Sequence, residues 1–429
     1  MPDGHDYIFD WNRLKKLHPL ATKPFGLLDE TLRDGIQSPS VTDPSTADKI
    51  ELIHLMESLG IEAADIGLPG AGPRSFAACR ALAQEMSTSR MALKAVCAAR
   101  TSVKDITPIV EIAQQAGRDI EVYAFIGSSP IRLFAEGWTT DTLREHIEES
   151  VRFAVGEGLQ LCLVTEDTTR SRPDVLDPLF RHAIDLGVTR LCLCDTVGHA
   201  TPDGIKNLFD WTQDLLRGVG VRVALDWHGH NDRGLGVTNT LRAIEAGADR
   251  VHGTGLGVGE RVGNAAMDQV LLNLKLLGAW EHDLSQLLTY CQRVAEVCKV
   301  DIPYNYPLAG HDAFRTGTGV HAAAIIKAER KGDQYLADRI YSGVPAGMFG
   351  RHQEIEIGHM SGMSNVIYWL QARKIPYDEG LLALVLQRAK AGDHVLREEE
   401  VLDLVREYRQ GQPFSGPPSS QLGDVEAVP

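Results

Sequence analysis

The 429-residue sequence lacks long apolar segments and has fewer positive than negative charges. Residues 1–16 contain no apolar stretch of signal-peptide length, and no later run approaches the roughly 20 residues of a membrane-spanning helix. Lysine and arginine number 43 against 58 aspartates and glutamates, which gives a net charge of −15. This balance argues against general binding to nucleic acid or to an anionic membrane. We therefore expect a cytoplasmic protein without a nucleic-acid or membrane partner.

The cysteines do not form the pattern of a disulfide framework. There are seven of them, an odd number, and four lie in apolar runs typical of strands. Buried thiols in a reducing compartment explain this pattern better. The hydrophobic content of 43% and the charged content of 24% are ordinary for a globular protein, and the length allows a large domain plus a smaller one.

From about residue 25 the sequence alternates between short apolar strand patterns and longer helical patterns. For example, residues 48–59 have the pattern of an amphipathic helix, and Gly60 follows them as a C-terminal cap would. Eight such units over about 250 residues predict a (β/α)8 TIM barrel. A doubly wound open sheet is the alternative, because periodicity does not show closure. The expected strands are residues 25–29, 63–67, 93–98, 120–126, 159–165, 190–195, 222–227 and 250–253.

After residue 277 the strand alternation stops and helical patterns dominate. We therefore expect a smaller, mainly α-helical C-terminal domain after the barrel. The final residues are rich in proline, glycine and serine, as disordered ends are. The predicted organisation is an N-terminal extension at 1–24, a catalytic barrel at 25–280, a helical linker at 281–318, the α-rich domain at 319–410 and a disordered tail at 411–429.

The chemically unusual side chains fall at the carboxyl ends of the expected strands, where barrels place their active sites. His228 and His230 are two apart at the end of a strand, so both imidazoles point to the same side. Imidazole is a ligand for Zn, Mn, Fe or Co, and an oxygen donor from another strand end would complete the site. A pair of hydrogen-bonded core histidines is the alternative. Polar groups at the other strand ends favour a metal site.

The glycine-rich run at 255–264 superficially looks like a dinucleotide-binding loop. It follows the last expected strand, however, and no ribose-binding acid stands about twenty residues on at a next strand. The sequence therefore does not favour a nicotinamide cofactor.

Three motifs in order resemble the 2-isopropylmalate synthase/homocitrate synthase family of TIM-barrel metalloenzymes. They are LRDGIQ at 32–37, HGHNDRG at 228–234 and GVGERVGN at 257–264. Past the barrel, GVH at 319–321 and the stretch 341–362 look like elements of the family's C-terminal region. The resemblance spans about residues 25–370 and implies condensation of an acyl-CoA, usually acetyl-CoA, with a 2-oxo acid, followed by thioester hydrolysis.

The resemblance also implies a set of site residues. A divalent metal (Mg, Mn, Zn or Co) would hold the ketone and carboxylate oxygens of the oxo acid and act as Lewis acid and template. Arg33 would place positive charge where the ketone oxygen becomes negative, and Thr196 looks like the threonine that binds the substrate carboxylate. The residues matching the family's metal ligands are Asp34, His228, His230 and Asn264.

Removing a proton from the methyl group of acetyl-CoA needs a base, and the family's candidates match Glu166 and His321. By resemblance, His321 would reach the barrel mouth of a partner subunit, which implies a homodimer.

The chain departs from the isopropylmalate enzymes around the expected oxo-acid pocket. It has Tyr123 in place of a histidine, and Cys192 and Cys194 where those enzymes have an Asn-Leu-Pro run. Arg132 and Arg170, at or just past strand ends, are candidates to bind a second anionic group such as a distal carboxylate or phosphonate. Surface or capping arginines are the alternative for both. These changes leave the identity of the oxo acid open.

Two rival functions remain. 3-Hydroxy-3-methylglutaryl-CoA lyase is a related barrel with the same arginine-aspartate-glycine and histidine elements, but such lyases place a cysteine in the loop at 255–264, and this loop has none. A non-catalytic barrel used as a binding module is the second rival, and the intact set of ligands and Glu166 argue against it.

Overall fold

The computed structural model describes residues 7–13, 20 and 23–411. Residues 412–429, most of the expected tail, lie outside the described residues, as does most of the expected N-terminal extension. The described chain divides into two compact units, one from Trp11 to Ile302 and one that joins residues 7–10 to the chain from Pro303 onward. We call them the barrel unit and the C-terminal unit. Among the described residues, no helix combines the length and the apolar character that crossing a membrane would require.

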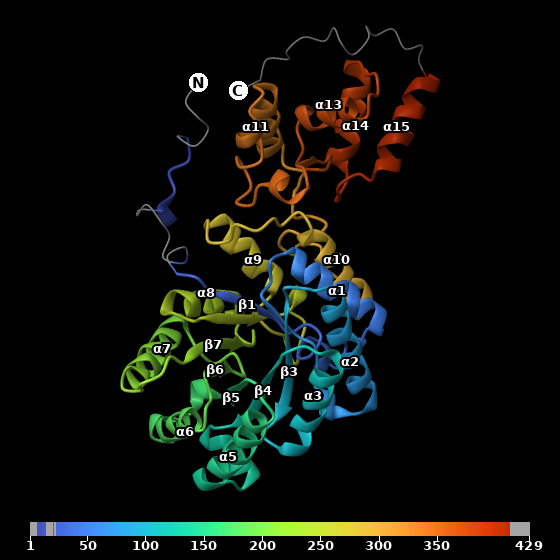
Figure 1. The fold of residues 1–429 in the computed structure, drawn as a ribbon. Helices are drawn as coiled ribbons and strands as arrows, with labels where there is room; N and C mark the ends of the chain where they lie inside the picture. Colours follow the sequence, from blue (N-terminus) through green and yellow to red (C-terminus); the bar gives the residue numbers. More distant parts are fainter. Residues whose placement is uncertain (1–6, 14–19, 21–22, 412–429) are drawn as a thin grey trace. The chain divides into compact units, whose positions relative to one another are not determined.

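The barrel unit contains eight parallel strands that close into a barrel in chain order, with β1 paired to β8 (Figure 1). This confirms the predicted TIM barrel and excludes the open sheet. The strands are β1 (Gly26–Asp29), β2 (Ala63–Asp65), β3 (Lys94–Arg100), β4 (Ile120–Gly127), β5 (Leu161–Glu166), β6 (Arg190–Asp195), β7 (Ala224–Gly229) and β8 (Arg250–Gly253).

Helices follow the strands and surround the barrel. They are α1 (Thr46–Ser58), α2 (Pro73–Thr88), α3 (Val103–Ala116), α4 (Pro130–Glu136), α5 (Thr140–Gly156), α6 (Pro173–Asp185), α7 (Pro202–Arg217), α8 (Gly236–Ala246), α9 (Met267–Leu276) and α10 (Leu287–Cys298). Local chemistry sets several ends: the Ser45 hydroxyl accepts from the backbone N–H of Asp48 at the start of α1, and Gly117 adopts the left-handed conformation that ends α3.

Helix α10, which lies in the segment expected as a linker, belongs to the barrel unit. Its Arg293 pairs with Asp48 (Nη2 to Oδ1, 2.5 Å) and Glu51 (Nε to Oε2, 2.7 Å) of α1. Its fully buried Tyr290 donates a hydrogen bond to Asp29 at the end of β1. The helix therefore supports the strand that leads into the first predicted site motif.

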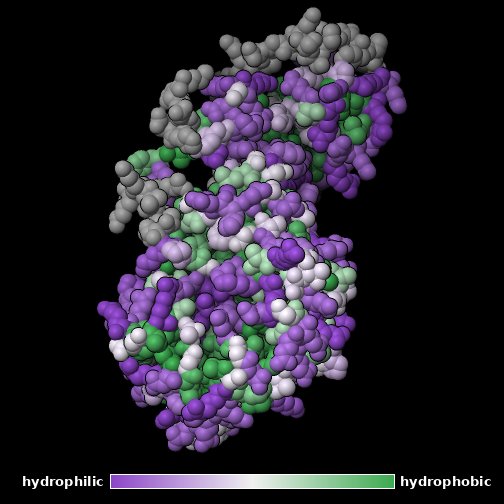
Figure 2. All heavy atoms as spheres, viewed as in Figure 1, coloured by the Kyte–Doolittle hydropathy of each residue, from purple (hydrophilic) through white to green (hydrophobic). Residues whose placement is uncertain are grey.

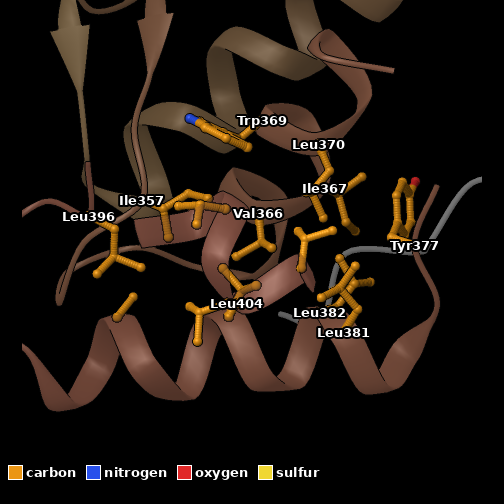
Figure 3. Close-up of a cluster of buried hydrophobic side chains, with 14 residues drawn as sticks. Ile357, Val366, Ile367, Trp369, Leu370, Tyr377, Leu381, Leu382, Leu396 and Leu404 are labelled. Carbon is orange, nitrogen blue, oxygen red and sulfur yellow. The ribbon is translucent and has the colours of Figure 1, made fainter. Parts of the chain in front are cut away.

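The C-terminal unit is mainly helical, as predicted. Its helices are α11 (Gly319–Arg330), α12 (Gln334–Ala337), α13 (Met363–Ala372), α14 (Glu379–Ala391) and α15 (Glu398–Gly411), with a two-stranded parallel pair of β9 (Arg315–Thr316) and β10 (Glu354–Ile355). Buried side chains of α13, α14 and α15 point toward one another and form an apolar core around Val366, Leu370 and Leu404 (Figure 3). Hydrophilic residues cover most of the visible face of each unit (Figure 2).

Candidate metal-dependent active site

The four predicted metal ligands come from three strand ends and lie together at the carboxyl end of the barrel. Asp34 stands in the loop after β1, and both histidines stand at the end of β7. Nε2 of His228 is 3.5 Å from Oδ2 of Asp34, and Nε2 of His230 is 3.4 Å from the same oxygen. Asn264 forms a backbone bridge with His230. The structure thus brings Asp34 to two histidines that are more than 190 residues away in the sequence.

The donor set fits a divalent cation. Oδ2 of Asp34 and Oδ1 of Asn264 are buried and have no hydrogen-bond partner, and Nε2 of each histidine faces that Asp34 oxygen. Buried polar atoms of this kind are costly unless something satisfies them. One carboxylate, two imidazoles and one amide oxygen form the mixed oxygen and nitrogen shell that Mn, Zn, Co or Mg accepts.

The glycine-rich loop after β8 explains how Asn264 reaches the histidines. Gly257, Gly259 and Gly263 all adopt positive φ angles of 68°, 153° and 88°. A Cβ at Gly259 would lie 2.2 Å from the Asn264 amide nitrogen, and one at Gly263 would lie 1.8 Å from the Gly257 carbonyl oxygen. Only glycine permits these conformations and approaches. The glycines fold the loop back onto the end of β7.

Arg33 is held beside the ligands by three carboxylates. Its Nη2 is 2.6 Å from Oε1 of Glu30, its Nε is 3.0 Å from Oδ2 of Asp65, and its Nη1 is 3.7 Å from Oδ1 of Asp34. Burial raises the pKa of Glu30, but His228 and Arg33 outweigh it and hold that pKa well below the usual range. Burial raises the pKa of Asp65 to about 7, against the opposing charge of Arg33.

Glu166 ends β5 and is register partner to Gly127 of β4. Its Oε2 lies 3.9 Å from Nη2 of Arg132, which also pairs with Glu136 at 3.2 Å. Burial raises the pKa of Glu166, and the positive charge of Arg132 opposes that shift. A glutamate with a raised pKa at the mouth of a barrel is suited to general acid or base chemistry.

Thr196 and Arg170 are both engaged within the protein. The Thr196 hydroxyl accepts a hydrogen bond from the backbone N–H of Asp167 at 2.9 Å. Arg170 makes two hydrogen bonds of 2.7 Å to the carboxylate of Asp167. Both arginines singled out from the sequence therefore pair with carboxylates, but Nε of Arg132 is buried without a hydrogen-bond partner.

Tyr123, Cys192 and Cys194 belong to a buried cluster of residues from the barrel strands. The Tyr123 hydroxyl donates to Asp226 and accepts from Nη1 of Arg250 at 2.9 Å. Sγ of Cys192 is 3.7 Å from Sγ of Cys194. The structure thus places Tyr123 in a charged network within the barrel and the two cysteines in its interior.

His321 lies in the C-terminal unit, near the start of α11, and is exposed. Its ring stacks on that of Tyr341, with centroids 4.0 Å apart and planes inclined by 27°.

Sequence reasoning missed the residues that support the ligands from inside the barrel. Glu30, Asp226 and His252 are at most 2% exposed. His252 lies 3.3 Å from Glu30 (Nδ1 to Oε1) and 3.2 Å from Asp226 (Nε2 to Oδ2). One of them could have been found from the sequence. Asp226 stands two residues before His228 on β7, so the two side chains point to the same face of the strand.

Comparisons with known proteins agree with this architecture. The HMGL-like family matches residues 25–294. The chain is 28% identical over 400 residues to homocitrate synthase AksA of Methanopyrus kandleri, covering 92% of this chain and 94% of the relative. It is 30% identical over 369 residues to a probable 2-isopropylmalate synthase of the same organism, covering 85% and 69%.

Among solved structures, hydroxymethylglutaryl-CoA lyase of Pseudomonas aeruginosa matches with a TM-score of 0.53 and 20% identity, covering 65% of this chain and 94% of the lyase. HMG-CoA lyase of Brucella melitensis matches with a TM-score of 0.53 and 19% identity, covering 65% and 100%. At these identities the likeness concerns the fold alone. With the family match extending over all eight strands and the Asp34 and histidine motifs, the chain belongs to the HMGL-like family.

Proposed function

We propose that this protein condenses an acyl-CoA, acetyl-CoA first among the candidates, with a 2-oxo acid and then hydrolyses the thioester. The names of its relatives support this reaction class. The observation that carries the proposal is the close approach of Asp34, His228 and His230, with Asn264 bridged to His230 and with unpartnered buried oxygens on Asp34 and Asn264. A divalent cation held by these residues would polarise the oxo acid as a Lewis acid.

The neighbouring side chains supply the remaining electrostatics. Arg33, fixed by Glu30 and Asp65, presents positive charge where the ketone oxygen becomes negative during attack. The Thr196 hydroxyl already accepts one hydrogen bond from the backbone. Its proton is therefore available to donate to the substrate carboxylate.

Glu166 and His321 are the proposed proton-transfer groups. A general base works best when its pKa lies near the working pH, because it is then both ionised and basic enough to take a proton. Burial raises the pKa of Glu166 in that direction. His321 is exposed, as a group acting on a partner subunit must be. The protein would therefore work as a homodimer, and mixing inactive Glu166→Gln and His321→Ala proteins is expected to restore activity through hybrid dimers. No recovery after mixing would contradict shared sites.

The oxo-acid pocket is proposed to involve Arg132 at the barrel mouth, with Tyr123, Cys192 and Cys194 shaping the interior beneath it. Arg170 contributes by holding Asp167, whose backbone N–H in turn fixes Thr196. Because Arg132 has a buried Nε without a partner, it is the better of the two arginines for a second anionic group of the substrate.

The test is a panel of 2-oxo acids mixed with acetyl-CoA, the protein and Mg²⁺, Mn²⁺, Zn²⁺ or Co²⁺, with free thiol followed over time. Thiol release that requires one oxo acid and disappears with a chelator is the expected result. Arg132→Gln should raise KM for an oxo acid with a distal carboxylate more than for one without. Cleavage of a hydroxyacyl-CoA without condensation would instead support a lyase, and neither reaction would support a binding module.

A further inference from the structure

Glu30 joins the catalytic arginine to one of the metal-ligand histidines. It follows the last residue of β1 and is 1% exposed. Its Oε2 is 2.6 Å from Nδ1 of His228, and its Oε1 is 2.6 Å from Nη2 of Arg33. Each carboxylate oxygen therefore serves a different cationic or N–H donor of the site.

The contact with Glu30 selects one form of the His228 ring. An ionised carboxylate only accepts hydrogen bonds, so Nδ1 of His228 must donate to it. The neutral ring then carries its free electron pair on Nε2, the atom that faces Oδ2 of Asp34 at 3.5 Å. A histidine bound to a metal characteristically donates its other N–H to such a partner, which fixes the ring and raises its basicity.

A second layer of contacts fixes Glu30 itself. His252 of β8 lies 3.3 Å from its Oε1, and His252 in turn lies 3.2 Å from Asp226 of β7. Arg190 of β6 and Tyr123 of β4 both donate hydrogen bonds to Asp226. Side chains of four strands thus surround this carboxylate, directly or through a neighbour, in addition to Arg33 of the loop after β1.

From this geometry we infer that Glu30 is a positioning residue that sets the orientation and tautomer of His228 and aligns Arg33 beside it. The inference rests on the proposed metal-dependent function, since it concerns how the protein prepares its metal ligands. Glu30 does not itself need to touch the substrate. Glu30 acts on metal affinity and on which nitrogen of the His228 ring carries the proton.

The main experiment measures Mn²⁺ affinity by calorimetry for the native protein, Glu30→Gln and Asp65→Asn. Glutamine keeps the shape of Glu30 but replaces one acceptor oxygen with a donor group, so it no longer serves His228 and Arg33 together. The expected result is affinity weakened about 10–100-fold in Glu30→Gln. Asp65→Asn is the matched control: Asp65 is equally buried and also holds Arg33, but it contacts no predicted ligand, so affinity should stay near native.

The outcomes distinguish a failure of the proposed metal-dependent function from a failure of the role assigned to Glu30. Native protein that binds no Mn²⁺ would overturn the proposed function together with this inference. Native protein that binds while Glu30→Gln binds equally well would overturn the inference alone. An equal loss in Asp65→Asn would also overturn it, because the effect would then come from Arg33 or from general damage to the barrel mouth.

A measurement on the native protein keeps the inference testable even if Glu30→Gln does not fold. Nitrogen NMR of histidine-labelled, metal-free protein, with His228 assigned by His228→Gln, should show a proton on Nδ1 of His228 and none on Nε2. A proton on Nε2 would overturn the inference.

Discussion

The interiors of the two units are filled with different chemistry. The C-terminal unit packs apolar side chains such as Leu370 and Leu404, and burying one of these is worth about 1.5–3 kcal/mol. The barrel interior contains, beside a small apolar cluster, the charged or polar residues Asp226, Arg250 and His252, all at most 2% exposed. Buried ion pairs return little net stability after desolvation. The difference indicates that the apolar core of the C-terminal unit contributes mainly to folding stability. The charged groups inside the barrel contribute mainly to the positions of the site residues.

Removing a predicted metal ligand should abolish turnover and metal binding without changing the stability of the barrel. In Asp34→Ala we expect turnover to fall to background and Mn²⁺ binding to be lost, because the aspartate supplies an otherwise unsatisfied buried oxygen. The free energy of unfolding of the metal-free protein should change little. Thiol release, calorimetry and urea denaturation measure the three quantities. Asp174→Ala, which removes an exposed carboxylate paired with Arg172, is the control that should leave all three unchanged.

Losing the proposed base should reduce turnover and leave metal binding intact. In Glu166→Gln we expect kcat to fall by about 10²–10⁴-fold, the usual contribution of a general base. A Mn²⁺ affinity that falls with kcat would show that Glu166 belongs to the metal site instead.

The pH profile of the native enzyme gives an independent test of Glu166. Burial and the acids Asp167 and Glu136 raise its pKa, while Arg132 and Arg33 lower it, with a net rise. Since the base must be ionised, kcat/KM should fall on the acid side at a higher pH than an ordinary glutamate would give. The raised pKa also means that ionised Glu166 destabilises the fold above its unfolded pKa. Glu166→Gln should therefore remove this acid limb and be no less stable at neutral pH.

A cavity in the apolar core of the C-terminal unit should lower stability and leave metal binding unchanged. Leu370 is fully buried in α13, so Leu370→Ala should lower the free energy of unfolding of the C-terminal unit by about 2–5 kcal/mol. Mn²⁺ affinity of the barrel should not change. Val320→Ala, at a residue 72% exposed in the same unit, is the matched control and should have little effect on unfolding. If Leu370→Ala weakened Mn²⁺ binding, the separation of roles drawn above would be wrong.

A helix cap gives the smallest effect. The Asp378 carboxylate accepts from the backbone N–H of Leu381 at the start of α14 and from the Tyr408 hydroxyl at 2.8 Å. Asp378→Ala should cost about 0.5–2 kcal/mol of stability, measured by thermal unfolding, with turnover unchanged. Asp378→Asn, which keeps an acceptor oxygen, should recover most of the loss, and equal losses in both variants would contradict a capping role.

The fold was accessible from the sequence because βα units are local patterns. The expected ranges 190–195 and 250–253 coincide with β6 and β8, and the other strands shift by three residues or fewer at either end. Closure was not a local property: it depends on pairing β1 with β8, whose residues are more than 200 positions apart.

The predicted ligands were found because each stands in a short motif at a strand end. Their roles remain predictions, and the structure places Asp34, His228 and His230 close together. The support beneath them was not found, since Glu30 and His252 are far apart in the sequence and carry no motif. Tyr123 was expected near the substrate, and only the packed barrel showed its hydroxyl held between Asp226 and Arg250.

The sequence by itself therefore determined the order of strands and helices and which side chains stand at the strand ends, because these follow from spacing along the chain. The family followed from the resemblance of three motifs. The tertiary structure alone decided that the barrel closes, that Arg170 is committed to Asp167, and that Glu30 connects Arg33 to His228. Barrel closure and the contact of Glu30 with His228 join residues from different strands, whereas Arg170 and Asp167 are neighbours in the turn after β5.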